Sequence, residues 1–286
     1  MKPPPFAYHA PASLEESLDL LGELGDGAAV LAGGQSLIPL LNLRLAAPDA
    51  VVDLRRIGCH AIVVGPDGAQ IGAMARASVV ERDEDVGVAA PSLVEALHEV
   101  GHPQIRNRTT IGGSVAHADP AAELPTVLVA LDGAITLRSA ARGERTVPAT
   151  EFFDGVFSTI REPDELVTSV WFPRFDGPST FLELARRPGD FALVGACLAL
   201  SVADGVVRDV RIGLSGVADR PVRARDAEDL LRGEQLTSAR LAEAATVTSS
   251  GLRPGSDVHA SGAYRATMAG VLVQRGLARL IGTVAR

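Results

Sequence analysis

Hydrophobic and polar positions near the start of the chain follow a spacing that predicts a helix. Ser13 and Glu16 form a capping box, in which two side chains accept hydrogen bonds from the free N–H groups of the first turn. Leu18 and Leu21 then mark one face of this helix, because residues three positions apart lie on the same side. Gly25 is placed to end it, since glycine readily adopts the backbone conformation found after helix C-termini.

A glycine-rich turn lies between short apolar segments in the rest of the first 57 residues. Ala28–Ala32 and Ala50–Leu54 are apolar runs typical of strands, and Leu37–Leu45 predicts a helix. Residues 33–36, with the sequence GGQS, therefore form a polar turn where a strand becomes a helix. The pattern predicts a small unit of mixed helices and strands over residues 1–57.

Residues 58–175 again mix strands and helices, and they contain a second glycine pair. The predicted elements are a hairpin of Ala61–Val64 and Ala69–Ala73, a helix from a capping box of Ser92 and Glu95 to about Val100, a helix from Asp119-Pro120 to about Leu131, and the strands Ala134–Arg138 and Leu166–Phe172. The second pair, Gly112-Gly113, is predicted to form another turn between strand and helix patterns, with hydroxyl residues on both sides. These elements predict a second mixed unit.

A segment containing proline and glycine, Pro173–Pro178, predicts a linker, and a different order of elements follows it. Strands come first and helices last: Phe181–Ala185, Ala192–Val202 and Val206–Leu214, then Ala224–Leu231, Ser238–Ser249 and Ala263–Ile281. We therefore predict a domain boundary near residue 175. The first domain would cover 1–175, with subdomains 1–57 and 58–175, and a C-terminal domain of antiparallel strands and helices would cover 176–286.

The charge and the metal-binding residue types exclude several classes of function. The chain has 27 Lys and Arg against 35 Asp and Glu, a formal net charge of −8, which disfavours a nucleic-acid surface. Cys59 and Cys197 are far apart and no Cys-x-x-Cys pair occurs, so this chain cannot by itself hold an iron–sulfur cluster or a cysteine-rich zinc site. His98 and His102 are separated by a predicted helix end, and we expect no metal site there.

The distribution of apolar residues predicts a cytoplasmic protein. The longest apolar run, roughly Phe191–Val202, is shorter than the ~20 residues that a transmembrane helix needs. The N-terminal residues show no signal-peptide pattern. Reduced thiols are therefore expected.

The two glycine pairs are the best candidates for a binding site. Glycine lets backbone N–H groups approach a ligand closely, and successive N–H groups form a nest for an anion. Taken alone, either pair is as readily a tight structural turn. Their shared setting, among Gln35, Ser36, Thr110 and Ser114, favours a cradle for a diphosphate. This hypothesis predicts that a valine side chain at Gly33 or at Gly112 would enter the path of the diphosphate and release the ligand while leaving the fold largely intact.

Two motifs in a fixed order carry a resemblance to a known family. They are Ala32–Leu37 (AGGQSL) and Thr110–Ser114 (TIGGS), the second followed by Asp119-Pro120 and by Glu123–Pro125. In this order and spacing they resemble the FAD-binding, or medium, subunit of molybdenum hydroxylases of the xanthine dehydrogenase family. The likeness covers nearly the whole chain and is strongest to medium chains of aerobic carbon monoxide dehydrogenase and of nicotine-type dehydrogenases.

The resemblance implies an α+β fold of the p-cresol methylhydroxylase type, in which two α+β subdomains hold a non-covalent FAD and a smaller C-terminal α+β domain closes over it. The first motif would wrap the diphosphate, the second would bind from the other side, and the acidic Glu123 would contact the cofactor. The resemblance assigns to FAD the residues Ala32, Gly33, Gly34, Gln35, Ser36, Leu37, Val100, Gly101, Thr110, Ile111, Gly112, Gly113, Ser114, Asp119, Glu123, Leu166 and Val167. It assigns no catalytic side chain and no metal ligand.

The resemblance also implies an FAD-dependent oxidoreductase subunit that relays electrons. Substrate oxidation would take place at a molybdenum cofactor on a large subunit. Electrons would pass through [2Fe–2S] clusters of a small subunit to this FAD, and leave to an acceptor such as a quinone, a cytochrome, oxygen or NAD. The implied assembly is a heterotrimer, paired as a dimer of trimers, either cytoplasmic or held at the inner face of the membrane through the complex.

Two positions depart from the family pattern, and other functions stay open. Ser114 stands where many relatives have Asp or Asn, and Glu183 stands where Lys is common, which would disfavour an anionic reduced flavin. Arg186, Arg187 and Asp190 belong either to a solvated turn or to a loop near the flavin edge. The alternatives are a stand-alone FAD oxidoreductase that acts directly on a small substrate, and a scaffold subunit that has no redox function.

Overall fold

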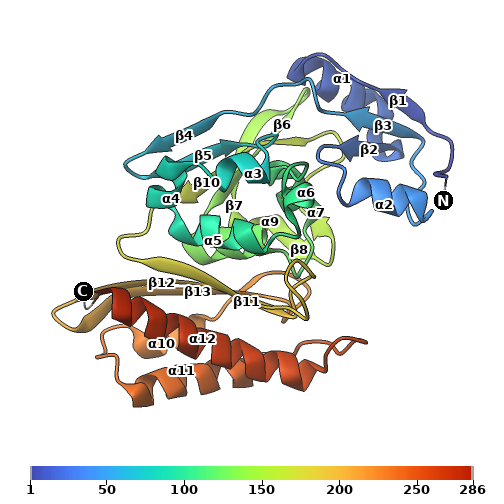
Figure 1. Cartoon of the computed structure of the whole chain (residues 1–286). Coiled ribbons are helices and arrows are strands. Elements are labelled where there is room, and N and C mark those ends of the chain that lie inside the picture. Colours follow the sequence, from blue (N-terminus) through green and yellow to red (C-terminus); the bar gives the residue numbers. More distant parts are fainter. Residues whose placement is uncertain (1, 285–286) are drawn as a thin grey trace.

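The structure is a computed structural model that describes residues 2–284, and it contains three main β-sheets surrounded by helices (Figure 1). Two of the sheets and the helices between them form a larger body, and the third sheet forms a smaller body with the last three helices. This arrangement confirms the predicted α+β fold with a larger first part and a smaller C-terminal part. None of the described helices has the length and apolar character needed to cross a membrane.

The first unit is a three-stranded parallel sheet with two helices. Its elements are β1 (Ala7–His9), α1 (Leu14–Leu24), the short 3-10 helix η1 (Gly25–Gly27), β2 (Ala28–Leu31), α2 (Leu37–Asn42) and β3 (Ala50–Asp53), with the strand order β1-β3-β2. The Ser13 hydroxyl accepts a hydrogen bond from the Glu16 N–H at 3.1 Å, and the Glu16 carboxylate accepts one from the Ala12 N–H at 2.7 Å. The predicted capping at the start of α1 is thereby confirmed, whereas α2 ends before Leu45.

The second unit is a five-stranded antiparallel sheet with the order β4-β5-β10-β6-β7. Its elements are β4 (Ile62–Gly65), β5 (Gly68–Gly72), α3 (Ala77–Val80), α4 (Glu84–Ala89), α5 (Pro91–Glu99), α6 (Pro103–Arg106), α7 (Ile111–His117), α8 (Glu123–Leu131), β6 (Ala134–Ser139), β7 (Gly143–Pro148), α9 (Ala149–Phe152), β8 (Phe153–Gly155), β9 (Ser158–Thr159) and β10 (Leu166–Pro173). The sequence pattern missed the short helices and β7–β9, because four-residue helices and polar edge strands leave almost no periodic signal.

The capping box predicted at Ser92 is wrong. Helix α5 begins one residue earlier, at Pro91, because proline fits the first helical position, where no N–H is needed. Ser92 is buried, and its N–H donates to the Ser179 hydroxyl of the C-terminal part at 3.2 Å. Glu95 is likewise turned toward that part of the molecule.

The helix start predicted at Asp119-Pro120 is also wrong. The Asp119 carboxylate accepts a hydrogen bond from the Ala121 N–H at 2.9 Å and so stabilises a short turn, and α8 begins only at Glu123. The Gly112-Gly113 pair is not a free turn either, since it lies in the first turn of α7. The second motif therefore places its glycines inside a helix.

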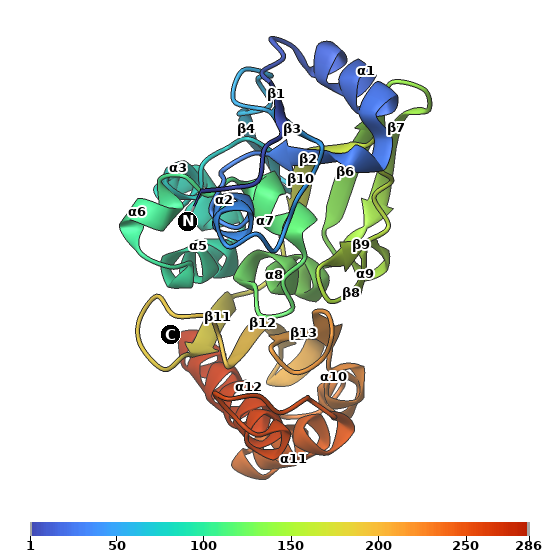
Figure 2. The same cartoon turned by 90° about the vertical axis from the view of Figure 1, so that its right-hand side faces the viewer.

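The C-terminal unit is a four-stranded antiparallel sheet with its own helices on one face, and α5 and α8 of the second unit lie against the other face (Figure 2). Its elements are β11 (Ser179–Leu184), β12 (Val194–Ala203), β13 (Val206–Ser215), β14 (Val222–Arg223), α10 (Arg225–Leu231), α11 (Ser238–Gly251) and α12 (Gly262–Val284). In β12 the side chains of Ala196 and Leu198 belong to the core with α12, whereas Cys197 and Ala199 belong to the core of the second unit. Burial on both faces explains the continuous apolar run of this strand.

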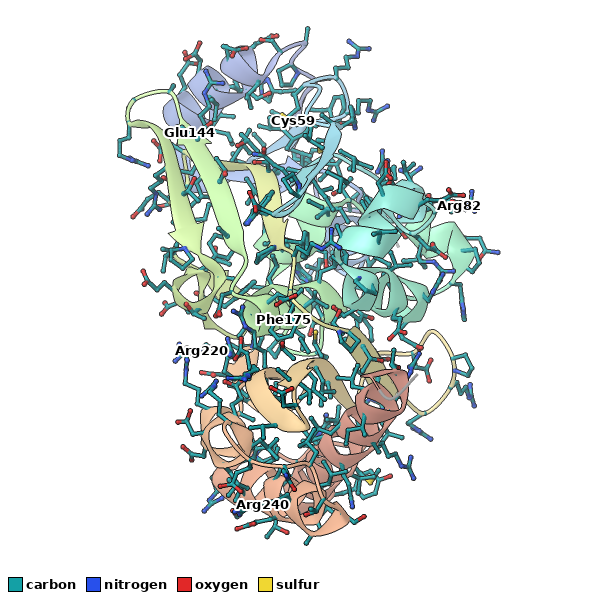
Figure 3. All side chains as sticks on the ribbon, turned by 90° about the vertical axis from the view of Figure 1, so that its left-hand side faces the viewer. Cys59, Arg82, Glu144, Phe175, Arg220 and Arg240 are labelled. Atoms are coloured by element: carbon teal, nitrogen blue, oxygen red, sulfur yellow. The ribbon has the colours of Figure 1, made fainter. Side chains whose placement is uncertain are left out.

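Polar contacts join the second unit to the C-terminal unit. The Glu95 carboxylate of α5 accepts hydrogen bonds from the Thr180 hydroxyl at 2.6 Å and the Phe181 N–H at 2.8 Å, and it pairs with Arg279 of α12 at 2.7 Å. Phe175 lies where the two bodies meet (Figure 3) and packs against the core of the second unit. These contacts fix the C-terminal unit in place beside the elements that form the site.

Candidate functional site

One cavity of about 510 Å³ lies where all three units meet. Its walls come from the β2–α2 loop, the α5–α6 segment, α7, the start of α8, the start of β10 and the β11–β12 loop. Helix α2, which follows the β2–α2 loop and also lines the cavity, and α7 lie near the centre of Figure 2. Every residue that the sequence assigned to the cofactor lines this cavity except Ile111, which is fully buried in the core.

The two glycine pairs lie directly against each other, although they are far apart in sequence. A Cβ atom on Gly33 would overlap the carbonyl oxygen of Arg108 and would lie 3.1 Å from the Cα of Thr109. A Cβ on Gly113 would lie 3.4 Å from the Cβ of Ala32. The absence of side chains here lets the two segments approach and form one continuous wall.

This contact corrects the predicted role of the glycines. A Cβ on Gly112 would overlap the Cβ of Ala73 and lie 2.8 Å from its Cα. A side chain at Gly33 or Gly112 would therefore meet protein backbone before it met a ligand. At Gly34 the requirement is conformational, because its φ of +77° lies in the left-handed region.

The first motif presents a row of free backbone donors. The N–H groups of residues 33–37 donate to no acceptor in the part of the chain that the structure describes. The Gln35 side chain folds back to the Gly33 carbonyl at 3.4 Å, and the Ser36 side chain lines the cavity. Successive N–H groups without internal partners are the donors that an anion nest requires.

The backbone N–H groups of the second motif donate hydrogen bonds to acceptors within the protein. The Ile111 N–H donates to the Ala75 carbonyl at 3.0 Å, and the Gly112 N–H donates to the Ala73 carbonyl at 2.8 Å. The Gly113 N–H donates to the hydroxyl of the helix-capping residue, Thr110, at 3.2 Å. This motif therefore offers the cavity its side chains and its surface, and not a second row of N–H groups.

Two largely buried carboxyl groups, Glu123 and Glu183, lie near each other, and the first of them lines the cavity. Glu123 lines the cavity, and burial, reinforced by Asp119 and Glu99, raises the pKa of its carboxyl to about 7. Glu183 on β11 has a buried Oε2 atom with no hydrogen-bond partner among the described residues, and burial together with Glu123 raises its pKa to about 9. Glu183 is thus protonated near pH 7, so the negative charge expected at this position is absent.

The C-terminal unit supplies part of the rim of the cavity. Gly189 packs against the α5–α6 segment, where an added Cβ would lie 2.5 Å from the ring of His102. Asp190 and Phe191 also line the cavity, and Phe191 is 81% exposed. The structure places Asp190 at the cavity, as one interpretation expected, whereas Arg186 and Arg187 are exposed and are not among the lining residues.

One end of the cavity is mostly apolar. Val30, Leu54, Met74 and Leu166 line it and belong to the core of the first unit. Arg161 lies beside Leu166 and brings a guanidinium group to this end. A site that combines a row of N–H groups with an acidic part and an apolar part fits a long ligand that carries an anionic group.

His117, at the end of α7, also borders the cavity. Its ring centroid lies 4.9 Å from that of Phe157, and burial lowers the pKa of its imidazole although Asp119 opposes this effect. His117 is therefore mainly neutral near pH 7 and adds a flat, uncharged surface to the wall.

Sequence reasoning missed about half of the lining. The lining residues that it did not assign are Ala29, Val30, Leu40, Leu54, Ala73, Met74, Ile105, Thr109, Ala116, His117, Ala121, Ala122, Arg161, Gly189, Asp190 and Phe191. The segment around Gly189 carried a usable signal, because its charged residues Arg186, Arg187 and Asp190 are typical either of a solvated turn or of a loop at the cofactor. Arg161 carried no signal of a binding site, because it stands in the charged stretch REPDE, which is typical of a solvated surface.

Comparison with known proteins accounts for both parts of the chain. Residues 4–175 match the family described as the FAD binding domain in molybdopterin dehydrogenase. Residues 179–280 match the CO dehydrogenase flavoprotein C-terminal domain. The chain therefore belongs to the family of FAD-binding flavoprotein subunits of molybdopterin dehydrogenases, and FAD is the cofactor of this oxidoreductase subunit.

Individual relatives match along their whole length. The chain is 38% identical to the nicotine 6-hydroxylase medium subunit of Paenarthrobacter nicotinovorans, over 96% of this chain and 97% of that protein. It is 34% identical to the carbon monoxide dehydrogenase medium chain of Hydrogenophaga pseudoflava, over 97% of each chain. Among solved structures, a chain of quinoline 2-oxidoreductase from Pseudomonas putida 86 superposes with a TM-score of 0.93 at 38% identity, over 98% of both chains. The resemblance stated from the motifs is thereby confirmed, and the chain is the medium FAD subunit of a molybdenum hydroxylase-type complex.

Proposed function

We propose that this chain holds FAD non-covalently in the cavity and relays electrons between [2Fe–2S] clusters of a partner subunit and an external acceptor. The observation that carries this proposal is the row of free N–H groups at residues 33–37, in a segment that lines a cavity with both acidic and apolar parts. A diphosphate is the anion in FAD, and it joins two heteroaromatic halves. Backbone donors bind it without any lysine.

The residues around the row are suited to hold and shield such a cofactor. Ser36 and Ser114 add hydroxyl groups, Glu123 offers a carboxyl to polar groups of the flavin half, and Phe191 supplies an aromatic surface at the rim. FAD, when bound, supplies the exchange between one-electron and two-electron chemistry. The protein side chains position the cofactor and exclude water, and none needs to serve as a general acid or base.

The partners follow from the relatives. Their names describe medium subunits or medium chains, and the named enzymes act on nicotine, carbon monoxide and quinoline. Chains that are each 34–38% identical to this one belong to enzymes named for different substrates, which supports a substrate site on another subunit. We propose that this chain joins a molybdenum-cofactor large subunit and a [2Fe–2S] small subunit, and that two such trimers pair.

The first test uses the purified full-length chain. We expect a yellow protein whose flavin is FAD and is released on denaturation, because no covalent bond holds it. We also expect no turnover of a small organic substrate by the chain alone, and reduction of its flavin by a partner that carries [2Fe–2S] clusters. Turnover by the isolated chain would instead show a stand-alone oxidoreductase. A colourless chain that takes up no FAD would show a scaffold.

A further inference from the structure

Arg161 is the sole Lys or Arg among the cavity-lining residues of the described chain, and it has no counter-ion there. The acidic residues that follow it are engaged elsewhere. Asp164 pairs with Arg142 at 2.5 Å, and the Glu165 carboxylate accepts two hydrogen bonds from Arg145, at 2.7 and 2.8 Å. Within residues 2–284, Arg161 forms no ion pair.

The backbone fixes the guanidinium and leaves part of it free. Nη1 of Arg161 donates to the carbonyl oxygens of Glu162 at 2.7 Å and Glu165 at 2.8 Å. Nε and Nη2 donate to no protein acceptor in the described part of the chain. Burial lowers the pKa of Arg161, yet an arginine stays protonated at neutral pH. A partly buried cation without a counter-ion is unfavourable unless a ligand supplies the anion.

The position of Arg161 selects one half of the ligand. The Glu165 carbonyl that holds it directly precedes Leu166, which lines the apolar end of the cavity with Leu54 and Met74. Glu123 lies near the other end, where a phosphate group would face a carboxyl group. The cationic end therefore suits the more negative half of a dinucleotide, and the acidic end suits the half whose N–H and O–H groups donate hydrogen bonds.

We propose that Arg161 binds the adenosine diphosphate half of FAD, an inference that rests on the proposed function. The free edge of the guanidinium matches the paired oxygen atoms of a phosphate group, and its plane can stack on a purine. Arg161 supplies the positive charge that the row of N–H groups lacks. The flavin half then occupies the end formed by Glu123 and Phe191.

The test compares Arg161→Leu with the full-length wild-type chain and with Arg208→Leu, a matched loss of charge at a side chain that is 64% exposed. FAD binding is measured by quenching of flavin fluorescence, and ADP binding by displacement of FAD. We expect Arg161→Leu to weaken both FAD and ADP by about 10- to 100-fold, the range for loss of one charge-assisted contact. At saturating FAD, the midpoint potential of the flavin should equal that of the wild type. Arg208→Leu should change neither affinity.

Each contrary result has a distinct meaning. Unchanged FAD affinity in Arg161→Leu would overturn the inference, and so would a shifted flavin potential with unchanged ADP affinity, because Arg161 would then contact the flavin half. A wild-type chain that binds neither FAD nor ADP would overturn the proposed function itself. If Arg161→Leu fails to fold, Arg161→Gln, which keeps a donor for the backbone carbonyls, is subjected to the same measurements with the same expectations.

Discussion

The two glycine motifs look alike in sequence but differ in what they present to the cavity. In the first, residues 33–37 keep five consecutive N–H groups free of protein acceptors. In the second, the N–H groups of residues 111–114 all donate within the protein, to the carbonyls of Ala73 and Ala75, just after β5, and to Thr110. One motif is therefore built to bind an anion and the other to pack against its neighbours.

The difference shows that glycine can be required twice for different reasons in one site. At Gly34 the backbone needs a positive φ, which lets the loop turn its N–H groups toward the cavity. At Gly112 the helix must approach Ala73 so closely that no Cβ fits between them. The comparison predicts that changes in the second motif affect stability first, whereas changes in the first motif affect FAD affinity first.

The largest expected effect is that of Gly112→Val. Its side chain would meet the Cα and Cβ of Ala73, which belong to a buried segment and cannot move away cheaply. We expect the free energy of unfolding to fall by about 3 kcal/mol or more. Urea unfolding of the FAD-free chain measures this loss without any contribution from the ligand.

Gly87→Val is the matched control for this prediction. Gly87 lies in α4, and a Cβ there would meet no atom within 4 Å. Its effect on stability should stay within about 0.5 kcal/mol. If Gly112→Val kept wild-type stability and lost only FAD, the second motif would be a ligand cradle after all, and the contrast between the motifs would be broken.

The next effect concerns pH, because both carboxyls at the acidic end gain charge as pH rises. Their pKa values, about 7 for Glu123 and about 9 for Glu183, lie above the value of roughly 4.3 expected in the unfolded chain. The folded state therefore keeps protons that the unfolded state releases. This contribution to stability is complete below pH ~4 and is lost as pH rises through 7 and then 9.

Glu183→Gln should flatten this dependence. We expect the free energy of unfolding of the FAD-free wild type to fall between pH 5 and pH 9, by at most about 1.4 kcal/mol per pH unit for each carboxyl that is protonated only when folded. In Glu183→Gln, the free energy of unfolding should no longer fall between pH 7 and pH 9. In the control Glu144→Gln, at an exposed position (Figure 3), it should fall over this range as in the wild type. An equally steep slope in Glu183→Gln would show that this carboxyl is already ionised. This experiment also defines the pH range in which the two motifs can be compared without a change of charge nearby.

Most of the fold could be predicted from the sequence, because its long elements carry strong periodicity. The run Val194–Leu200 and the helix after Gly262 are examples, since burial of whole faces leaves a regular pattern. The start of α5 at Pro91 could not be predicted from the capping pattern. Ser92 and Glu95 there serve contacts with the C-terminal unit, which a local pattern does not contain.

The site was predicted in its position but not in its chemistry. Both motifs line the cavity, as the resemblance implied, but the sequence cannot show whether the N–H of Gly112 is free or bonded to Ala73. That difference depends on the segment that follows β5, nearly forty residues away in the sequence. Arg161 was missed for the same reason, because only the fold brings this charged stretch to the wall of the cavity.

The smallest expected effect gives the most direct comparison of the two motifs. Ser36 and Ser114 each line the cavity and carry the same hydroxyl group, so Ser36→Ala and Ser114→Ala are equal truncations. If the first motif holds the diphosphate, we expect Ser36→Ala to weaken FAD binding by about 5- to 10-fold, and Ser114→Ala by about twofold or less. Neither variant should change the free energy of unfolding by more than about 0.5 kcal/mol, so affinity from flavin fluorescence can be compared directly. Equal losses would mean that both motifs grip the cofactor alike, and a larger loss at Ser114 would reverse the assignment, because the free N–H row would then not be where the diphosphate is bound.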